Sequence, residues 1–187
     1  MTYSSAIFAS EEQGLTEAQQ NKYRKIAELA DIKAGDSVLE IGCGWGGFME
    51  FAAKNLNAHV TGITISNAQY EFARKRMQKQ CLSDRTELKL LDYRDLNQKF
   101  DKIISIEMFE AVGEQYWPVY FDKIGHSLKE CGKAALLIIT ISEHEFPKSR
   151  DTPDFIQRYI FPGGMRPSIS ALQNPISKAG LQINDSY

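Results

Sequence analysis

The sequence predicts an α/β fold in which a mostly parallel sheet carries helices on both faces. Short apolar segments rich in β-branched residues alternate with segments of helical periodicity along most of the chain. The first apolar segment runs directly into a glycine cluster at residues 42–47, and a helical pattern follows it. Because parallel strands need crossover connections, this alternation favours βαβ units over hairpins.

The composition limits the class of protein to which this chain can belong. The chain has 187 residues, 43% of them hydrophobic, and a formal net charge of −2. It lacks the basic excess that usually accompanies nucleic-acid binding. Three cysteines without metal spacing (Cys43, Cys81 and Cys131) are typical of free thiols in a reducing compartment. With no apolar run of about 18–20 residues and no signal-peptide pattern, we expect a cytoplasmic protein.

Local patterns predict each element. A helix is expected from Glu11 to Ala30, capped by Thr16 with Gln19 as its capping-box partner. Further helices are expected at residues 47–55, 67–80, 116–129 and 168–179, and strands at 37–41, 59–65, 87–91, 100–106 and 133–141. The last of these strands is apolar enough to be central and buried on both faces. Another strand is expected to begin at residues 181–183.

The segment at residues 142–167 breaks this rhythm. It contains four prolines and the pair Gly163 and Gly164. A loop of this length inside a compact domain is typically functional or disordered. Its aromatic residues favour an ordered lid or pocket wall: Phe146, Phe155, Tyr159 and Phe161. We therefore expect one domain, 1–187, made of an N-terminal segment and helix (1–30), a nucleotide-binding core (31–141) and a lid or acceptor region (142–187).

The glycine turn is the strongest chemical signal. Gly42, Gly44 and Gly47 fit the dinucleotide pattern G-x-G-x-x-G, so a dehydrogenase has to be considered. A NAD site needs an acid at the end of the second strand, and residues 62–66 contain none. Instead, Glu40 precedes Gly42 by two residues. Acid-x-Gly-x-Gly-x-Gly resembles the first motif of class I S-adenosylmethionine-dependent methyltransferases, which have a Rossmann-like fold.

In such enzymes the acid helps to place the amino-acid end of the cofactor. Asp92, after the third strand, lies where they usually contact the adenine. The alternatives are a solvated strand-end carboxylate for Glu40 and a turn-forming residue for Asp92.

Several longer segments resemble the cyclopropane-fatty-acid synthase family. The two most specific are the turn Gly42-Cys43-Gly44-Trp45-Gly46 and the segment at residues 105–113, Ser-Ile-Glu-Met-Phe-Glu-Ala-Val-Gly. The others lie at residues 3–6, 64–69, 92–95 and 159–164. The resemblance spans the chain in order. Because the family continues past Tyr187, it predicts a fold whose C-terminal part is truncated.

The resemblance implies S-adenosylmethionine as the cofactor. Tyr3 and Ser4 would close over it, although a frayed terminus is the alternative for them. Gly42 and Gly44 would lie under its methionine part. The full implied set is Tyr3, Ser4, Glu40, Gly42, Cys43, Gly44, Trp45, Gly46, Thr64, Ser66, Gln69, Asp92, Tyr93 and Arg94. Thr64 and Gln69 would make the ribose and adenosine contacts, and Tyr93 would flank the adenine.

The resemblance also implies the chemistry. The acceptor would be a cis double bond in an unsaturated phospholipid acyl chain. Its attack on the sulfonium methyl leaves a carbocation, and closing a cyclopropane ring then requires a base. Glu110 is the candidate, with an ordinary helix-entry carboxylate as the alternative and Glu107 as a weaker rival. In the family the matching Glu helps to hold a bicarbonate ion.

This sequence departs from the family at three places. Ser5 stands where well-known members have Cys, and Ile139 stands where they have His. The Tyr that completes their bicarbonate site would lie beyond Tyr187. Ser5 could still donate a hydrogen bond, whereas Ile139 could do so only through its backbone. These departures put a bicarbonate cofactor in doubt.

Other functions remain open at this stage. A branch of the family methylates the double bond and leaves a methylene group. Some plant N-methyltransferases of small amines are similar through residues 105–110, and a non-catalytic cofactor-binding fragment is a third possibility. The basic run Arg74-Lys75-Arg76 with Lys79 is either a contact to an anionic membrane or a solvated face. The scattered His59, His126 and His144 predict no metal site.

Overall fold

The computed structural model describes the chain except residues 153–154, 156–157, 160–162 and 187. Its contacts divide the chain into two compact units, each described here by itself. The first unit comprises Met1–Ile106 and Ser127–Leu136. The second comprises Glu107–His126 and Leu137–Tyr187.

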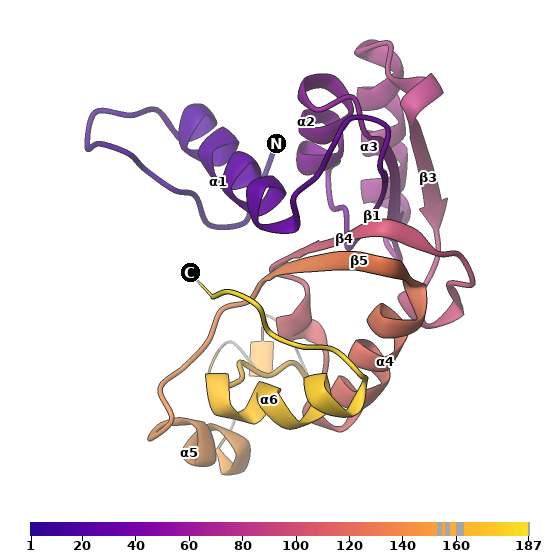
Figure 1. Cartoon of the computed structure of the whole chain (residues 1–187). Helices are drawn as coiled ribbons and strands as arrows, with labels where there is room; N and C mark the ends of the chain where they lie inside the picture. Colours follow the sequence, from indigo (N-terminus) through magenta and orange to yellow (C-terminus); the bar gives the residue numbers. More distant parts are fainter. Residues whose placement is uncertain (153–154, 156–157, 160–162, 187) are drawn as a thin grey trace. The chain divides into compact units, whose positions relative to one another are not determined.

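A five-stranded sheet forms the centre of the first unit (Figure 1). The strands are β1 (Ser37–Ile41), β2 (His59–Thr64), β3 (Thr86–Leu90), β4 (Phe100–Ile106) and β5 (Leu128–Leu137), in the order β3-β2-β1-β4-β5. β1 pairs in parallel with both β2 and β4, and β2 pairs in parallel with β3. Ile41 at the end of β1 is in register with Ile63 and Ser105. The carboxyl ends of β1 to β4 therefore meet at one edge, where open α/β sheets bind ligands.

Three helices accompany this sheet in the first unit. α1 (Leu15–Ala30) packs against α2 (Gly47–Asn55) and β4, while α2 and α3 (Asn67–Lys79) pack against β2 and β3. Two short 3-10 helices, η1 (Ser83–Arg85) and η2 (Tyr93–Asp95), flank β3. Val38, Leu39, Phe48 and Ile103 are among the fully buried core residues. Within the described residues, no helix is long and apolar enough to cross a membrane.

The second unit has an aromatic core of its own. Its helices are η3 (Phe109–Ala111), η4 (Glu114–Tyr116), α4 (Trp117–Ser127), α5 (Phe146–Asp151) and α6 (Ile169–Lys178). The ring of Phe109 lies 5.1–5.4 Å from the rings of Trp117, Tyr120 and Phe121. Phe146 stacks on Trp117 at 6.1 Å, so it belongs to this core.

The predicted bounds of β1, α2 and β4 are confirmed to the residue. The predicted start of α1 was wrong. The helix begins at Leu15 with Gly14 as its N-cap, and Thr16 and Gln19 lie inside it. Gln13 instead closes a turn before the helix, because its side-chain oxygen accepts a hydrogen bond from the amide of Ala9.

Two predictions at the C-terminal side were also wrong. β5 begins at Leu128, before the expected start, and it is an edge strand with mostly exposed residues instead of a central buried one. Charged side chains such as Lys129 and Lys133 suit an edge, where they discourage further strand pairing. Residues 181–183 form no strand. Gly180 adopts a positive φ of 71° and the amide of Leu181 donates to the carbonyl of Ile176, which caps α6.

Candidate functional site

The glycine turn closes the carboxyl end of β1. Gly42, Gly44 and Gly46 have φ values of 75°, 53° and 75°, which side chains rarely tolerate. The amides of Gly42 and Cys43 both donate to the carbonyl of Ile63 at 3.0 Å, and the amide of Gly46 donates to the carbonyl of Cys43. The first two bonds fix the turn against β2, and the third closes the turn on itself. The turn offers a ligand mainly a surface free of side chains.

The side chain of Tyr3 covers this surface. A β-carbon on Gly44 would lie 3.5 Å from Cε1 of the Tyr3 ring, in van der Waals contact, so the ring lies directly over the side-chain position of Gly44. Gln69 donates from its amide nitrogen to the Tyr3 hydroxyl at 3.3 Å and accepts from the Thr64 hydroxyl at 2.7 Å. The Ser66 hydroxyl caps α3 by accepting a hydrogen bond from the backbone N–H of Gln69. The structure thus joins four of the predicted cofactor residues in one network above Gly44.

Ser4 and Ser5 are attached to α1. Gln19 donates from its amide nitrogen to the carbonyl of Ser4 at 2.7 Å. The ammonium group of Lys22 donates to the hydroxyl of Ser4 and, at 2.7 Å, to the carbonyl of Ser5. The segment is therefore anchored, which contradicts the frayed terminus considered as the alternative.

Two side chains at the turn, those of Glu40 and Cys43, are buried. Glu40 is 3% exposed, and burial raises the pKa of its carboxyl to about 8, against a hydrogen bond from the amide of Met49. Its atom Oε2 has no hydrogen-bond partner among the described residues. Burial also raises the pKa of the Cys43 thiol, whose side chain packs against Gly62 of β2. Glu40 is thus buried and not a solvated strand-end carboxylate.

Asp92 follows β3 and shapes the next turn. Its carboxylate accepts from the backbone amide of Arg94 at 2.9 Å and from the Arg94 guanidinium at 2.9 and 2.7 Å. These bonds hold the pKa of the Asp92 carboxyl below its usual range. The amide of Leu91 donates to the carbonyl of Thr64, which brings this turn beside the end of β2. Asp92 therefore has the turn-forming role considered as its alternative, and contacts of Asp92, Tyr93 and Arg94 with adenine remain predictions.

Close packing behind the turn explains two further predicted positions. A β-carbon on Gly46 would lie 3.1 Å from that of Ala73, so Gly46 permits the close approach of α2 and α3. The ring of Trp45 packs edge-on against Phe72 at 5.2 Å, and its carbonyl accepts from Arg76. These contacts place Trp45 and Gly46 as supports of the turn. Direct contact with a cofactor remains a prediction for both.

Glu110 lies in the second unit, on η3. Its side chain is 8% exposed, and burial raises the pKa of its carboxyl. One carboxylate oxygen accepts a hydrogen bond from the amide of Ile139, and Oε2 has no partner among the described residues. The carbonyl of Glu110 accepts from the amide of Met165 at 2.8 Å. Glu110 is therefore a buried, oriented carboxyl and not an ordinary surface acid at a helix entry.

The predicted lid aromatics are only partly described. Phe155 and Tyr159 are exposed, and their rings lie 5.1 Å apart. Phe161 lies outside the described residues, as do Pro153 and Pro162. A pocket lined by these aromatics remains a prediction.

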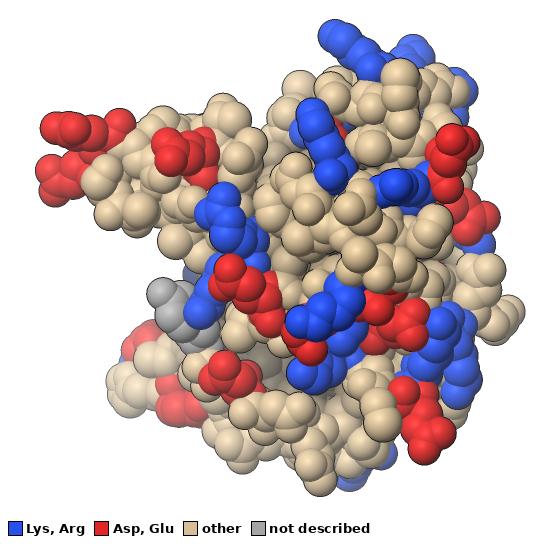
Figure 2. Space-filling view, turned by 45° about the horizontal axis from the view of Figure 1, so that its top comes forward, with Lys and Arg blue, Asp and Glu red and all other residues tan. Residues whose placement is uncertain are grey.

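Charges of both signs are interleaved over the face drawn in Figure 2. In the basic run of α3, Arg74 pairs with Glu71 and Arg76 pairs with Glu50. Two of the four cations proposed to touch a membrane are thus held by acids of the same unit. Among the described residues, no group of three or more His, Cys, Asp or Glu side chains is arranged to hold a metal ion.

The sequence analysis did not predict that Gln19 and Lys22 hold the N-terminal segment. Both lie on the buried face of α1 together with Tyr23 and Ile26, at helical spacing. Polar residues on an apolar helix face need partners inside the protein, and that requirement was the available signal.

Comparisons with known proteins agree with this geometry. The family model described as mycolic acid cyclopropane synthetase matches residues 1–187. A probable fatty acid methyltransferase of Pseudomonas putida is 39% identical over 99% of this chain and 48% of its own length. The cyclopropane-fatty-acyl-phospholipid synthase of Escherichia coli (strain K12) is 39% identical over 90% of this chain and 42% of its own length. The chain thus spans about half the length of these curated relatives.

Solved structures give the same fold. The cyclopropane synthase MmaA2 from Mycobacterium tuberculosis matches with a TM-score of 0.88 and 26% identity over 98% of this chain and 68% of that one. The mycolic acid cyclopropane synthase CmaA1, complexed with SAH and CTAB, has a TM-score of 0.84 and 26% identity, with the same coverage of 98% and 68%. The Rossmann-like methyltransferase fold is therefore confirmed, and the chain belongs to the mycolic acid cyclopropane synthetase family of S-adenosylmethionine-dependent methyltransferases.

Proposed function

We propose that this chain transfers a methyl or methylene group from S-adenosylmethionine to the cis double bond of unsaturated phospholipid acyl chains. The observation that carries the proposal is the buried carboxyl of Glu110, oriented by the Ile139 amide and with one oxygen lacking a partner among the described residues. An alkene acceptor needs such a base, whereas transfer to a nucleophile that is already deprotonated does not.

The first unit fits the cofactor. The glycines at positions 42, 44 and 46 leave the turn without side chains that would keep a ligand away from its backbone. The unpartnered buried oxygen of Glu40 suits an ammonium donor such as the amino group of a methionine moiety. When bound, S-adenosylmethionine supplies an electrophilic methyl group. The protein's residues have only to hold it, align the acceptor and exclude water.

Glu110 would receive the proton that the new methyl group loses. The electrons of that C–H bond would then close the ring, and the acid form of Glu110 would return its proton to solvent after product release. A raised pKa makes the ionised carboxylate a stronger base than a surface glutamate. A 1,2-hydride shift that moves the cation to the carbon bearing the new methyl group, followed by loss of a proton from that methyl group to the same base, would instead give a methylene-branched product.

The described residues do not favour bicarbonate as the base. The polar hydrogen that Ile139 provides is its amide, and this hydrogen already donates to Glu110. An isoleucine side chain adds no donor for a separate anion. The base in the proposed reaction is therefore the Glu110 carboxylate itself.

Methylation of a small amine is the second candidate. Coclaurine N-methyltransferase, solved with N-methylheliamine and SAH, is 30% identical over 90% of this chain and 50% of its own, with a TM-score of 0.75. The lipid reading is supported by the higher identity of the two lipid-modifying relatives, 39% each. A non-catalytic cofactor-binding fragment would bind the cofactor and methylate neither acceptor.

Mass spectrometry of lipids tests the proposal. The protein is incubated with vesicles of a monounsaturated phosphatidylglycerol and S-adenosylmethionine carrying a trideuterated methyl group. We expect the acyl chain to gain one carbon that retains two deuterium atoms, because one deuteron is lost to the base. Proton NMR of an unlabelled product then distinguishes ring from methylene protons.

Vesicles of the matching saturated lipid are the control and should gain no mass. Coclaurine in place of the vesicles tests the amine alternative. Methylation of the amine without any change in the unsaturated lipid would overturn the proposal in favour of the second candidate.

A further inference from the structure

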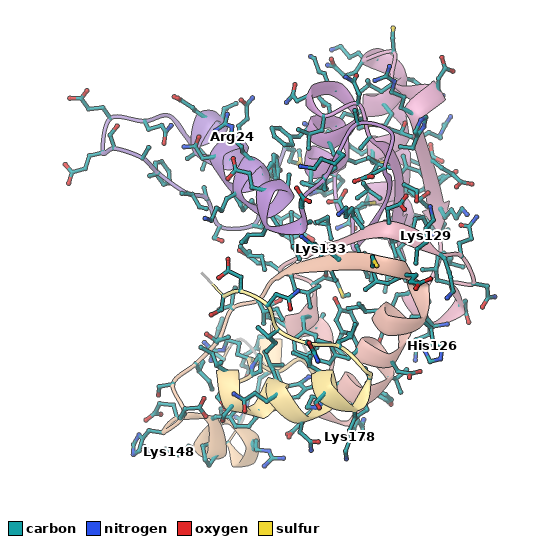
Figure 3. The ribbon with its side chains drawn as sticks, viewed as in Figure 1. Arg24, His126, Lys129, Lys133, Lys148 and Lys178 are labelled. Carbon is teal, nitrogen blue, oxygen red and sulfur yellow. The ribbon has the colours of Figure 1, made fainter. Side chains whose placement is uncertain are left out.

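The N-terminal strap, residues 1–7, is held against α1 by side chains of one helix face. Besides the bonds to Ser4 and Ser5, the Thr2 hydroxyl lies 2.7 Å from the Tyr23 hydroxyl, and Asn21 donates to the carbonyl of Ile7 at 3.1 Å. Arg24 of the same helix lies on its exposed side (Figure 3). Four residues of the strap, Thr2, Ser4, Ser5 and Ile7, are therefore bound by side chains of α1, while Tyr3 is bound by Gln69 of α3.

Lys22 is unusual within this face because it carries a charge. Its side chain is 1% exposed, which is rare for lysine, and its ammonium lies 5.2 Å from the centre of the Tyr23 ring. A buried ammonium is costly unless its hydrogen bonds and charge are matched. Lys22 also acts electrostatically on the buried carboxyl of Glu40 behind the glycine turn. A residue that only joined the strap to α1 would not require a buried charge.

The direction of the Lys22–Ser4 hydrogen bond has a chemical consequence. An ammonium group only donates, so the Ser4 oxygen accepts and its own hydroxyl hydrogen is left to be donated. Along the chain, Ser4 directly follows Tyr3, whose ring covers Gly44. A hydroxyl that accepts from a cation is a stronger donor, and it suits an anionic acceptor.

We propose that Lys22 is a positioning residue that fixes Ser4 and Ser5 on α1, next along the chain to the Tyr3 that covers Gly44, and thereby sets the affinity for the amino-acid end of the cofactor. This inference rests on the proposed binding of S-adenosylmethionine. It assigns Lys22 no contact with the reacting methyl group.

The test compares two ligands that differ at that end. S-adenosylhomocysteine carries the amino acid with its ammonium and carboxylate groups, whereas 5′-methylthioadenosine keeps the adenosine and sulfur but lacks both groups. Isothermal titration calorimetry is done with the wild-type protein and with Lys22→Met. We expect the substitution to weaken S-adenosylhomocysteine about ten- to a hundredfold, the usual effect of losing a charge-assisted hydrogen bond, and to leave 5′-methylthioadenosine within about twofold.

The 5′-methylthioadenosine titration also shows that the variant is folded. Lys79→Met is the matched control, since it removes one positive charge from an exposed position at the end of α3, and it should bind both ligands like the wild type. Equal weakening of both ligands by Lys22→Met would reduce Lys22 to a structural role and overturn the inference. So would unchanged binding of both.

The single variant Ser4→Ala keeps the inference testable if Lys22→Met is poorly folded, and a double-mutant cycle joins the two substitutions where both variants fold. If Lys22 acts through Ser4, then Ser4→Ala alone should reproduce much of the selective loss, and Lys22→Met should add little to it. Full additivity would contradict the inference. Failure of the wild-type protein to bind S-adenosylhomocysteine at all would instead contradict the proposed function.

Discussion

The carboxylate of Glu110 accepts a hydrogen bond from the main-chain amide of Ile139, within the second unit. This bond orients one oxygen of a buried carboxyl and leaves Oε2 without a partner among the described residues. A side chain at position 139 is not needed for the contact. Isoleucine at position 139, where the resemblance to the family implies histidine, is therefore compatible with an oriented Glu110.

Glu110→Gln should abolish methyl transfer while sparing cofactor binding. The amide oxygen of glutamine can still accept from Ile139, so the fold of the second unit is kept, but the group can no longer take up a proton at neutral pH. We expect turnover of unsaturated phospholipid to fall by about 10²- to 10⁴-fold, the usual contribution of a general base. Affinity for S-adenosylhomocysteine should change less than about twofold in calorimetry.

Glu130→Gln is the control for this prediction, because Glu130 is an exposed glutamate of β5. It should leave turnover unchanged. If Glu110→Gln turned over like the wild type, the Glu110 carboxyl could not be the base.

Gly44→Val should abolish cofactor binding. Gly44 has a φ of 53°, and a β-carbon would already lie 3.5 Å from the Tyr3 ring, so a branched side chain would fill the ligand's space. Gly35→Val is the matched control. Gly35 also has a positive φ, 86°, but nothing lies within 4 Å of its β-carbon position. Both variants carry similar backbone strain, and calorimetry with S-adenosylhomocysteine should show lost binding only for Gly44→Val.

The sequence predicted the sheet and the turn more reliably than the partners of individual side chains. The bounds of β1 and α2 follow from a local pattern, an apolar run ending at glycines and a helix starting after them. The edge position of β5 depends on which strands neighbour it, and its apolar residues pointed to the centre instead. Lys22 was missed because a lysine on a helix is usually solvated, and only the strap explains its burial.

Glu40→Gln should change how stability depends on pH. The folded carboxyl has a pKa of about 8 against 4.5 ordinarily, so between these values the folded protein holds a proton that the unfolded chain has lost. The free energy of unfolding therefore falls as pH rises from about 4.5 to 8, and above pH 8 the loss is complete. Urea unfolding at pH 5.5 and 8.5 should show a drop in the wild type that is larger by a few kcal/mol than in the variant, at about 1.4 kcal/mol per pKa unit.

Glu28→Gln, a change at an exposed position of α1, should leave the wild-type pH dependence in place. Parallel pH dependence of the wild type and Glu40→Gln would show that Glu40 is ionised in the folded protein at neutral pH.

Gly47→Ala should destabilise the protein and loosen the strap. A β-carbon at position 47 would lie 2.3 Å from the Tyr23 hydroxyl oxygen and 2.9 Å from the Thr2 hydroxyl oxygen, far inside normal contact. We expect a loss of about 1–3 kcal/mol in the free energy of unfolding, as for other overpacked sites. Affinity for S-adenosylhomocysteine should also fall, because Tyr3 follows the displaced Thr2.

Tyr23→Phe tests the cause of this loss, because it removes the oxygen that collides with the new β-carbon. Added to Gly47→Ala, it should recover part of the stability. Tyr23→Phe alone should lower the stability, because it removes the bond to Thr2. Simple additivity of the two substitutions in urea unfolding would show that the Tyr23 hydroxyl is not what requires glycine at position 47.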